Sequence, residues 1–414
     1  MQATSEILSK RQWQFFWIIA FIGGLIFAHR FQNVQQDAPL QLSVIHRPIA
    51  SGIIGLMIFI FYLRRLSVMF SRIMVPISLF CIWSLLSFAW SVNPLWTGYR
   101  TIEYTLIISL TAYTAVSFRS DTDCQKWINL MWGWLGILLM LTWLGIFIAP
   151  EEALIRSSGM IPFSLNGVYP RINSNSVSHL GAIISIVAFC RLLDKKNKKW
   201  LLVMIWGLAT IILSQGRSGL LGFIFGFITV LILYKRIGLF LGISLLIMFF
   251  ILELNYGDFL LTYGMRGQKI EMIYSLSGRV EKWQHAWLFI EKNPLLGYGA
   301  FAGSRFYVMP EMSGFYSLSG STHSLWVELL TNVGAIGCFI FGIVLFKIFY
   351  NLLYELLNSK EKIRRSISIE MIAVFSILFV RSFFTHVMIT HNSFPFFTII
   401  GTAIFLQYSR TRNS

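Results

Sequence analysis

The stretch 213-LSQGRSGLLGF-223 decides the fold, because it sets an arginine between two long apolar runs. The runs on either side are typical of bilayer-spanning helices, and only a short connection separates them. A permanent positive charge in so short a connection costs free energy and usually has a functional reason. Arg217 therefore indicates a membrane hairpin with a charge that needs a partner.

The composition of the whole chain agrees with a membrane setting. Of 414 residues, 56% are hydrophobic and 13% are charged, and the mean hydropathy is +0.67. This profile is typical of a polytopic membrane protein and excludes a soluble enzyme. The net charge of +16 is explained by short basic loops between the apolar runs, as the positive-inside rule predicts, and not by nucleic-acid binding.

Apolar stretches recur along the full length of the chain. They predict about twelve transmembrane helices, some extended by polar flanks. We therefore predict an all-α polytopic integral membrane protein with a single membrane domain over residues 1–414. The predicted spans lie near 13–28, 48–63, 73–90, 98–117, 127–149, 174–193, 200–213, 218–234, 237–254, 324–357, 366–381 and 394–408.

Basic clusters fall on one side of these spans, which we assign to the cytoplasm together with both termini. The opposite side carries the longest connection, 255–323, which we predict to be a large ordered loop. Within it, Trp283, Trp287 and Ile290 have helical spacing before Asn293-Pro294. This pattern predicts a short amphipathic helix followed by a glycine-rich turn at the membrane surface.

The cysteines and histidines do not form a recognisable metal or disulfide pattern. Cys81, Cys124, Cys190 and Cys338 all lie outside the predicted outer loops, so no disulfide is expected. Neither CxxC, HExxH nor DxD spacing occurs, and the sequence therefore predicts no metal site.

Three polar residues are predicted on the same outer side. Arg217 lies between two spans, Arg279 precedes the amphipathic helix, and His323 begins a span. Guanidinium groups suit phosphate oxygens, and imidazole can accept a proton near neutral pH. Each residue also has an ordinary alternative. Arg217 could be an interfacial arginine, Arg279 a loop charge, and His323 a hydrogen-bonding residue at a helix start.

Four further polar positions leave alternatives open. Arg171 and Asn175 could present donors near a helix N-terminus, or could be an interfacial arginine and a helix cap. Arg381 could join the site, or could be neutralised by other intramembrane charges such as those of Arg100 and Glu103. Glu328, five residues after His323, could be no more than an interfacial charge.

Three stretches, in order and spacing, resemble the signature blocks of the O-antigen ligase and Wzy-type O-antigen and exopolysaccharide polymerase superfamily. The stretches are 214-SQGRSGLLGF-223, 277-SGRVEKWQHAWLFIEKNPLLGYGAF-301 and 322-THSLWVELLTNVGAIG-337. One departure is Ser324, which stands where that superfamily commonly has asparagine after the histidine.

The resemblance implies a metal-independent, inverting membrane glycosyltransferase without a cofactor. It implies that a glycan carried on undecaprenyl diphosphate is transferred to a sugar hydroxyl at the periplasmic side of a bacterial inner membrane. Carried onto this sequence, Arg217 and Arg279 would bind the diphosphate. His323 would act as the catalytic base on the acceptor.

The identity of the acceptor stays open between a lipid-linked repeat, as in a polymerase, and lipid A-core, as in a ligase. The run 297–301 with Phe306 and Tyr307 favours a polymerase, with which a chain-length regulator could cooperate. Protein glycosylation is a third possibility. A flippase for lipid-linked oligosaccharides is the alternative from another class, but its cationic residues should line a cavity at mid-membrane depth.

Overall fold

The structure is a computed structural model. It describes residues 14, 17–20, 42–62, 68–70, 72–157, 160–195, 197–236, 238, 242, 262–263, 275–312, 320–390 and 393–413.

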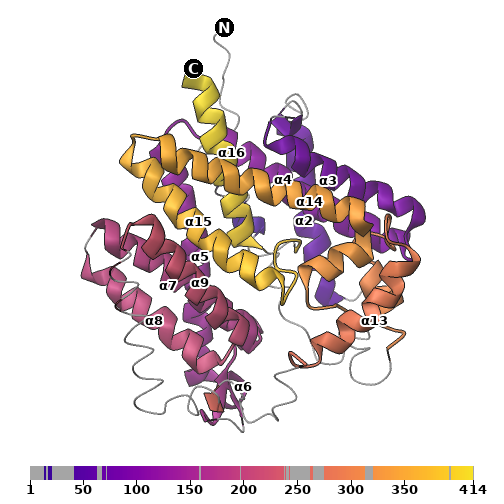
Figure 1. Ribbon diagram of the computed structural model, residues 1–414, viewed down its shortest axis with the longest axis horizontal. Helices are drawn as coiled ribbons and strands as arrows, with labels where there is room; N and C mark the ends of the chain where they lie inside the picture. Colours follow the sequence, from indigo (N-terminus) through magenta and orange to yellow (C-terminus); the bar gives the residue numbers. More distant parts are fainter. Residues whose placement is uncertain are drawn as a thin grey trace. The chain divides into compact units, whose positions relative to one another are not determined.

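Helices dominate the described part of the chain (Figure 1). The longer ones are α2 (Leu42–Tyr62), α3 (Met74–Leu86), α4 (Pro94–Ser117), α5 (Asp121–Ile148), α7 (Ser174–Lys195), α8 (Lys198–Ser214), α9 (Arg217–Leu233), α13 (Arg279–Lys292), α14 (Leu325–Asn358), α15 (Lys362–Ser382) and α16 (Phe394–Asn413). Shorter elements are the 3₁₀ turn η2 (Ser87–Trp90), α6 (Pro150–Ala153), the π-helical turn η3 (Ser304–Val308), and strands β1 (Leu154–Arg156) and β2 (Phe163–Leu165).

The predicted membrane character is confirmed for part of the chain. Helices α5, α7 and α14 are long and apolar enough to cross a bilayer. Three shorter apolar helices, over Pro48–Ile60, Met74–Trp90 and Arg217–Leu233, also coincide with predicted spans. The predicted spans 13–28 and 237–254 lie largely outside the described residues, so the number twelve stays a prediction. An antiparallel pair of three-residue strands, β1 and β2, adds a small strand element to the predicted all-α fold.

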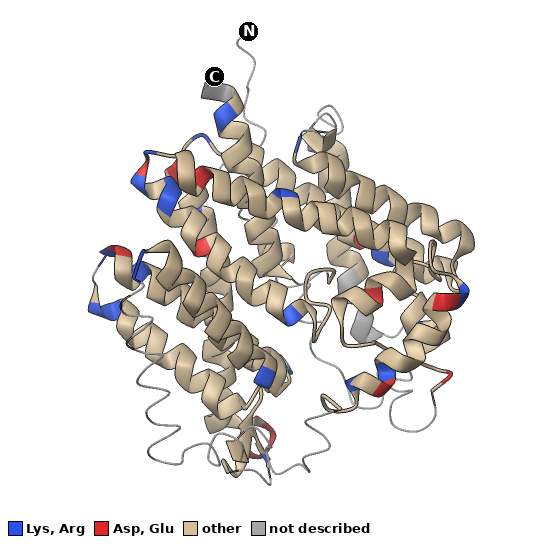
Figure 2. Cartoon of the chain, in the orientation of Figure 1, with Lys and Arg blue, Asp and Glu red and all other residues tan. Residues whose placement is uncertain are grey.

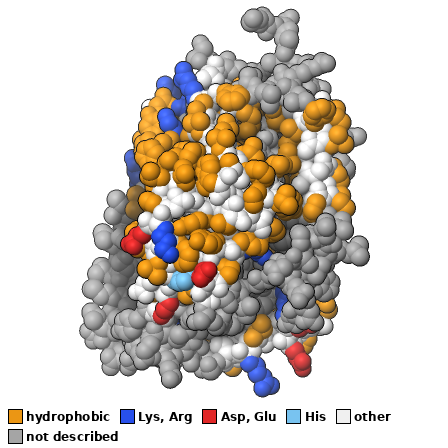
Figure 3. All heavy atoms as spheres, turned by 90° about the vertical axis from the view of Figure 1, so that its right-hand side faces the viewer, with side chains coloured by type: hydrophobic (Ala, Val, Ile, Leu, Met, Phe, Trp, Pro, Cys, Tyr) orange, Lys and Arg blue, Asp and Glu red, His pale blue; other side chains and the backbone are white. Residues whose placement is uncertain are grey.

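Charged residues lie mainly near helix ends, and the helix bodies carry few of them (Figure 2). Apolar side chains also reach the surface, as for Phe59 at 64% exposed, Phe147 at 82% and Phe339 at 71%. Figure 3 shows one face with a broad hydrophobic area and charged side chains toward its margins. Exposed apolar surface of this extent fits contact with lipid.

The chain divides into two compact units, each described here by itself. Unit 1 comprises Met1–Met131, Arg279–Asn358 and Ser382–Ser414, and unit 2 comprises Trp132–Gly278 and Ser359–Arg381. The core of unit 1 contains Phe341 of α14, whose ring centroid lies 4.9 Å from that of Phe80 in α3 and 6.1 Å from that of Phe396 in α16. These aromatic contacts join helices that are far apart in the sequence.

Helix α14 is interrupted at Gly334, which has a φ of 67°. The segment after α13 fills the interruption, because Tyr298 N donates to Thr331 O at 2.9 Å and Ala335 N donates to Pro294 O at 2.8 Å. A side chain at Gly334 would overlap the backbone of Leu295. The glycine therefore lets two backbone segments meet and satisfy groups that a broken helix leaves open.

Unit 2 is built around close packing of α7 against α8 and α9. A Cβ atom on Gly181 of α7 would lie only 2.8 Å from Gly207 O of α8. Ser178 Oγ donates to Gly216 O at 3.0 Å, just before α9 begins. Small residues let these backbones approach closely, as is common between helices in membranes.

A buried ion pair adds a polar tie within unit 2. Arg191 Nε of α7 lies 3.0 Å from Glu370 Oε2 of α15, and Trp132 Nε1 donates to Glu370 Oε1 at 2.6 Å. Glu370 is 4% exposed, so its charge depends on these partners.

Candidate functional site

His323 lies in a short loop directly before α14. Its φ of 55° is in the left-handed region, which a residue other than glycine adopts only when its surroundings require it. The loop passes into the helix at Ser324, whose carbonyl oxygen accepts from Glu328 N at 3.0 Å. The imidazole is half-buried. The fold therefore holds His323 at a defined turn at the helix start.

Glu328 is the group that fixes this turn. Its side chain is buried, at 7% exposed, and it accepts from Thr322 N at 3.1 Å and from Thr322 Oγ1 at 2.8 Å. The hydroxyls of Ser304 and Ser321 also donate to it. A carboxylate with several donors is satisfied in a buried place and constrains the groups that bind it. The interpretation of Glu328 as an interfacial charge is therefore wrong.

Helix α13 contacts the same loop from another side. Trp283 Nε1 donates to Thr322 O at 2.9 Å. Helix α13 runs from Arg279 to Lys292 and ends before Asn293, as the sequence predicts. The indole thus joins the helix that carries Arg279 to the loop that carries His323.

Basic side chains from two segments, α13 and the segment after α15, act on the His323 imidazole. Burial lowers the pKa of His323 to about 3, and the charges of Lys282, His386 and Arg279 lower it further in that order. Ser321 connects the His323 loop to the segment of His386, because its hydroxyl lies 3.1 Å from His386 Nδ1 and accepts from His323 N at 3.1 Å. Burial and the neighbouring positive charges therefore both favour the neutral form of the His323 imidazole near neutral pH.

Arg279 and Lys282 occupy the first turn of α13. The Arg279 guanidinium carbon is 5.9 Å from the centroid of the Phe384 ring. Lys282 is only 6% exposed, and its pKa is lowered by burial and by the charge of Arg279. Arg279 and His323, both predicted from the sequence, thus lie in one site of unit 1.

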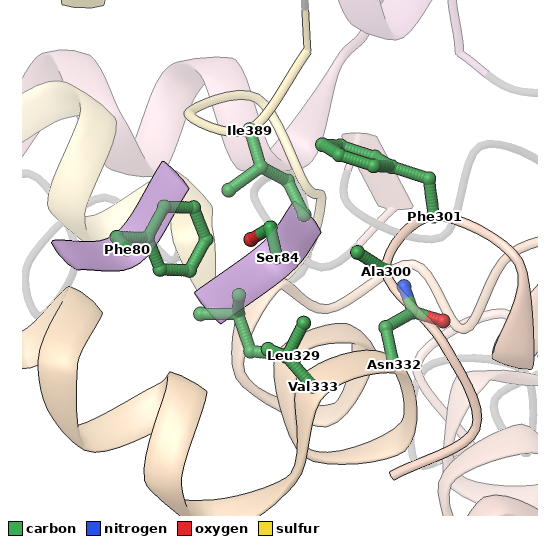
Figure 4. A pocket seen from close by; sticks show the side chains of 8 residues that line it. All are labelled: Phe80, Ser84, Ala300, Phe301, Leu329, Asn332, Val333 and Ile389. Carbon is green, nitrogen blue, oxygen red and sulfur yellow. The ribbon is translucent and has the colours of Figure 1, made fainter. Parts of the chain in front are cut away.

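A small apolar pocket in unit 1 contains none of the predicted site residues (Figure 4). It is lined by Phe80, Ser84, Ala300, Phe301, Leu329, Asn332, Val333 and Ile389. Its lining includes the glycine-rich turn after α13 at Ala300 and Phe301. The pocket carries no titratable side chain, and we do not assign the reaction to it.

Arg217 is in unit 2, as the first residue of α9. Its Nη1 atom lies 3.5 Å from Ser277 Oγ, a long distance for a hydrogen bond. The preceding turn is firmly held, because Gln215 has a φ of 53° and its Nε2 atom donates to Phe163 O at 2.6 Å. A cation at a helix N-terminus is disfavoured by the helix dipole, which supports a functional reason for Arg217.

The remaining predicted residues also lie in unit 2. Arg171 is exposed, and Asn175 is half-buried in the first turn of α7. The cap of α7 is Asn173, whose side chain accepts from Ser176 N at 2.9 Å. Arg381 Nη1 donates to Asn175 O at 3.1 Å. This bond joins α15 to α7 and gives Arg381 a structural contact. Substrate binding by Arg171, Asn175 and Arg381 stays a prediction.

The suggested neutralisation of intramembrane charges holds for one pair. Arg100 Nη1 lies 2.5 Å from Glu103 Oε2 in α4 of unit 1. Arg381 belongs to the other unit and contacts a backbone carbonyl, as described above.

Sequence reasoning missed Lys282, His386 and the role of Glu328. Lys282 could have been found, because it is three residues after Arg279 and therefore on the same face of the predicted helix. His386 is 63 residues beyond His323 (386 − 323) and carries no local signal. Among the described residues, no group of three or more His, Cys, Asp or Glu side chains could hold a metal ion.

Comparison with protein families finds a match within one segment of this helical membrane protein. Residues 202–342 match the model of the family described as O-antigen ligase. The matched segment contains Arg217, Arg279 and His323. The match confirms the resemblance found in the sequence over this segment, and it supports a membrane enzyme of the O-antigen ligase and polymerase type. No curated protein matches the chain significantly.

Proposed function

We propose that this protein transfers a glycan en bloc from undecaprenyl diphosphate to a sugar hydroxyl at the periplasmic side of the bacterial inner membrane. The observation that carries the proposal is the placement of His323 in a loop that buried Glu328 holds and that Trp283 joins to the helix of Arg279 and Lys282. The family match over the same residues supports it.

In the proposed reaction, the acceptor hydroxyl oxygen forms a bond to the anomeric carbon of the donor. The bond from that carbon to the phosphate oxygen breaks, and its electron pair leaves with undecaprenyl diphosphate. A ring nitrogen of His323 takes the hydroxyl proton, and attack opposite the leaving group inverts the anomeric carbon. The imidazolium later passes the proton to solvent, which restores the neutral base.

The arginines have an electrostatic role in this proposal. Negative charge develops on the diphosphate as the glycosidic bond breaks, and preorganised cations stabilise that charge. We assign this role to Arg279 and, from the family resemblance, to Arg217. Because the diphosphate already activates the sugar, the proposed step requires neither a nucleotide nor a metal ion.

Arg217 can be tested by a substitution that keeps its charge. Arg217→Lys loses the two-pronged donor geometry, and we expect transfer to fall about tenfold or more. Arg236→Lys is the matched control, because Arg236 is exposed at the other end of α9. Equal transfer by the two variants and the wild type would remove Arg217 from the mechanism.

We propose that the acceptor is another lipid-linked repeat unit, which makes the protein a polysaccharide polymerase. The aromatic and glycine-rich run 297–301, with Phe306 and Tyr307 after it, supports this choice. A ligase acting on lipid A-core is the second candidate, because the matched family is described as O-antigen ligase.

The glycan of a deletion strain distinguishes these two acceptors. Loss of a polymerase leaves glycan of a single repeat unit on the core. Loss of a ligase leaves core-only lipopolysaccharide together with accumulated lipid-linked polymer. The second result would contradict the proposed acceptor and establish the ligase.

Reconstitution distinguishes the enzyme from a flippase. Purified protein with lipid-linked donor, acceptor and a chelator, without nucleotide, is expected to form a new glycosidic bond. Movement of lipid-linked glycan across the bilayer without any new bond would refute the proposed function.

A further inference from the structure

We infer that the second half of α13 and the turn after it form a membrane-docking surface, which inserts into the lipid leaflet nearer His323. The docking surface consists of the apolar side chains of Trp287, Leu288, Leu295 and Leu296, each between 37% and 58% exposed. The partner that we assign to it is the bilayer itself, at the boundary between the headgroups and the acyl chains. The inference goes beyond glycan transfer and does not rest on it.

The exposed side chains of α13 change in character along the helix. In its first half they are polar, at Glu281 and Gln284, and in its second half they include Trp287 and Leu288. A helix in water would expose polar side chains along its whole length, and a helix buried in hydrocarbon would expose none. The change therefore indicates that α13 passes from water to the membrane surface along its length.

Two charged residues in the last turn of α13 limit how deep the docking surface inserts. Glu291 and Lys292 are both exposed. The Lys292 ammonium lies 5.0 Å from the centroid of the Phe289 ring, and a long side chain of this kind can keep its charge at the headgroups while its stem lies on apolar surface. The end of α13 therefore lies at the headgroup level and not in the hydrocarbon core.

The turn after α13 is bound to a helix that can cross the bilayer. Ala335 N donates to Pro294 O at 2.8 Å and Ile336 N donates to Leu295 O at 3.4 Å, at the interruption of α14. Helix α14 is long and apolar enough to span a membrane. Its first exposed side chain is that of Ile336, followed by that of Phe339. The turn therefore lies where the exposed apolar surface of α14 begins.

A second apolar helix ends at the same turn. Trp90 Nε1, in η2 directly after α3, donates to Leu296 O at 3.2 Å, and Trp83 Nε1 of α3 donates to Val333 O at 3.0 Å. Tryptophan joins an apolar ring to a polar N–H and is enriched where hydrocarbon meets headgroups. The exposed apolar side chains at this end of α3 and in η2 are Leu85, Leu86 and Phe88. A bilayer that covers the exposed apolar surfaces of α3 and α14 therefore also covers the docking surface.

The docking surface gives α13 a fixed end at the membrane. The other half of the helix contacts the loop of His323, because Trp283 Nε1 donates to Thr322 O at 2.9 Å. Helix α13 thus connects the headgroup level to the loop before α14, and the inference places this loop on the water side of the headgroups.

The test measures the surroundings of a fluorophore placed in each half of this region of the full-length protein. Leu295→Cys and the matched control Gln284→Cys are made in a Cys338→Ser background, since Cys338 is the one of the four cysteines that is not buried. Both variants are labelled with the fluorophore NBD and reconstituted in vesicles of phosphatidylethanolamine and phosphatidylglycerol. Iodide quenches the label from water, and a nitroxide on the lipid acyl chain quenches it from the bilayer. The background protein without an introduced cysteine reports any labelling of the buried thiols.

We expect the label at position 295 to emit at shorter wavelength than the label at position 284. The nitroxide lipid should quench it several-fold more strongly, and iodide several-fold more weakly, because one label lies among acyl chains and the other in water. Glycan donor takes no part in the measurement, so its outcome is independent of glycan transfer.

Equal quenching at both positions by iodide and by the nitroxide lipid overturns the inference. A label at position 295 that neither agent quenches also overturns it, because protein then covers the surface, and recovery of iodide quenching on dilution with lipid identifies a second copy of this chain. Nitroxide quenching that undecaprenyl phosphate abolishes overturns it as well, because the surface then binds an isoprenoid chain and not bulk lipid.

Should Leu295→Cys unfold at a lower temperature than the wild type, Leu288→Cys decides, because Leu288 is exposed within α13 and away from the interruption of α14. Quenching of that label by the nitroxide lipid supports the inference, and quenching by iodide alone overturns it.

Discussion

The turn before α14 and the turn before α9 each bring a polar side chain to the start of an apolar helix, but different forces hold them. The His323 turn in unit 1 is fixed by hydrogen bonds from Thr322 N to buried Glu328 and from Trp283 Nε1 to Thr322 O. The Arg217 turn in unit 2 is fixed by the hydrogen bond from Gln215 Nε2 to Phe163 O and also by glycines packed against Ser178. Both turns have polar partners that are distant in the sequence, and the second depends in addition on the absence of side chains at its glycines.

This difference explains which parts of the site can be read from the sequence. Arg217 and His323 stand out because each interrupts or heads an apolar run, which is a local signal. The contacts of Ser321 with Glu328 and of Ser321 with His386 join segments up to 65 residues apart. No periodicity encodes such contacts, so Glu328 could not be distinguished from an interfacial charge.

The fold divides in a similar way. The amphipathic helix predicted before Asn293-Pro294 and the apolar spans at 127–149, 174–193 and 324–357 follow from period and composition, and the structure has helices there. The interruption of α14 at Gly334 was not predicted, because it depends on Leu295 and Pro294 reaching the helix from elsewhere in the chain. Hydropathy describes the length of a span and not a break that other backbone groups fill.

The largest expected effect concerns the side chain that the unit 1 turn presents. His323→Ala removes the proposed base, and we expect glycan transfer to fall by about 10²–10⁴-fold, as is typical for general-base catalysis. The loop contacts of Glu328 do not involve the imidazole, so insertion and donor binding should persist. Transfer is measured with reconstituted protein and purified donor and acceptor, and a loss of less than fivefold would remove His323 from the reaction.

The next effect tests the polar scaffold of that turn. Glu328→Ala leaves the buried donors of Thr322 without their acceptor, at a cost of about 1–3 kcal/mol for each unsatisfied group. We expect transfer to fall about tenfold or more, together with a lower midpoint of thermal unfolding. Glu328→Gln keeps an acceptor oxygen and should lose less of both. Equal transfer by the wild type and the Ala variant would show that Glu328 does not position His323.

A smaller effect tests the packing that holds the Arg217 turn. A Cβ atom on Gly219 would lie 2.7 Å from Ser178 Cβ, and we expect Gly219→Ala to destabilise the protein by about 1–3 kcal/mol. Adding Ser178→Gly should recover part of the loss in thermal unfolding. Gly136→Ala is the control, because a Cβ atom there meets nothing within 4 Å. Equal unfolding temperatures for the Gly219 and Gly136 variants would contradict the packing argument.

The smallest effect at neutral pH concerns the charge environment that distinguishes the His323 turn, and it is visible only in acid. In the free protein, burial and the charges of Lys282, His386 and Arg279 hold the pKa of His323 at about 3. A bound diphosphate adds negative charge near the imidazole, favours its protonated form and therefore raises this pKa.

Because the proposed base acts when unprotonated, activity is lost as pH falls through the pKa of His323 in the free protein or in the donor complex. The acid limb of kcat/KM reports the free protein and that of kcat reports the donor complex, so the kcat limb should lie at higher pH. In Lys282→Met the acid limb of kcat/KM should shift to higher pH, since a positive neighbour of His323 is removed. The acid limbs of kcat/KM and kcat should then lie closer together in pH. If the acid limbs of kcat/KM and kcat lie at the same pH in the wild type, the charge of the donor does not change the pKa of His323. The diphosphate would then have to bind away from this turn.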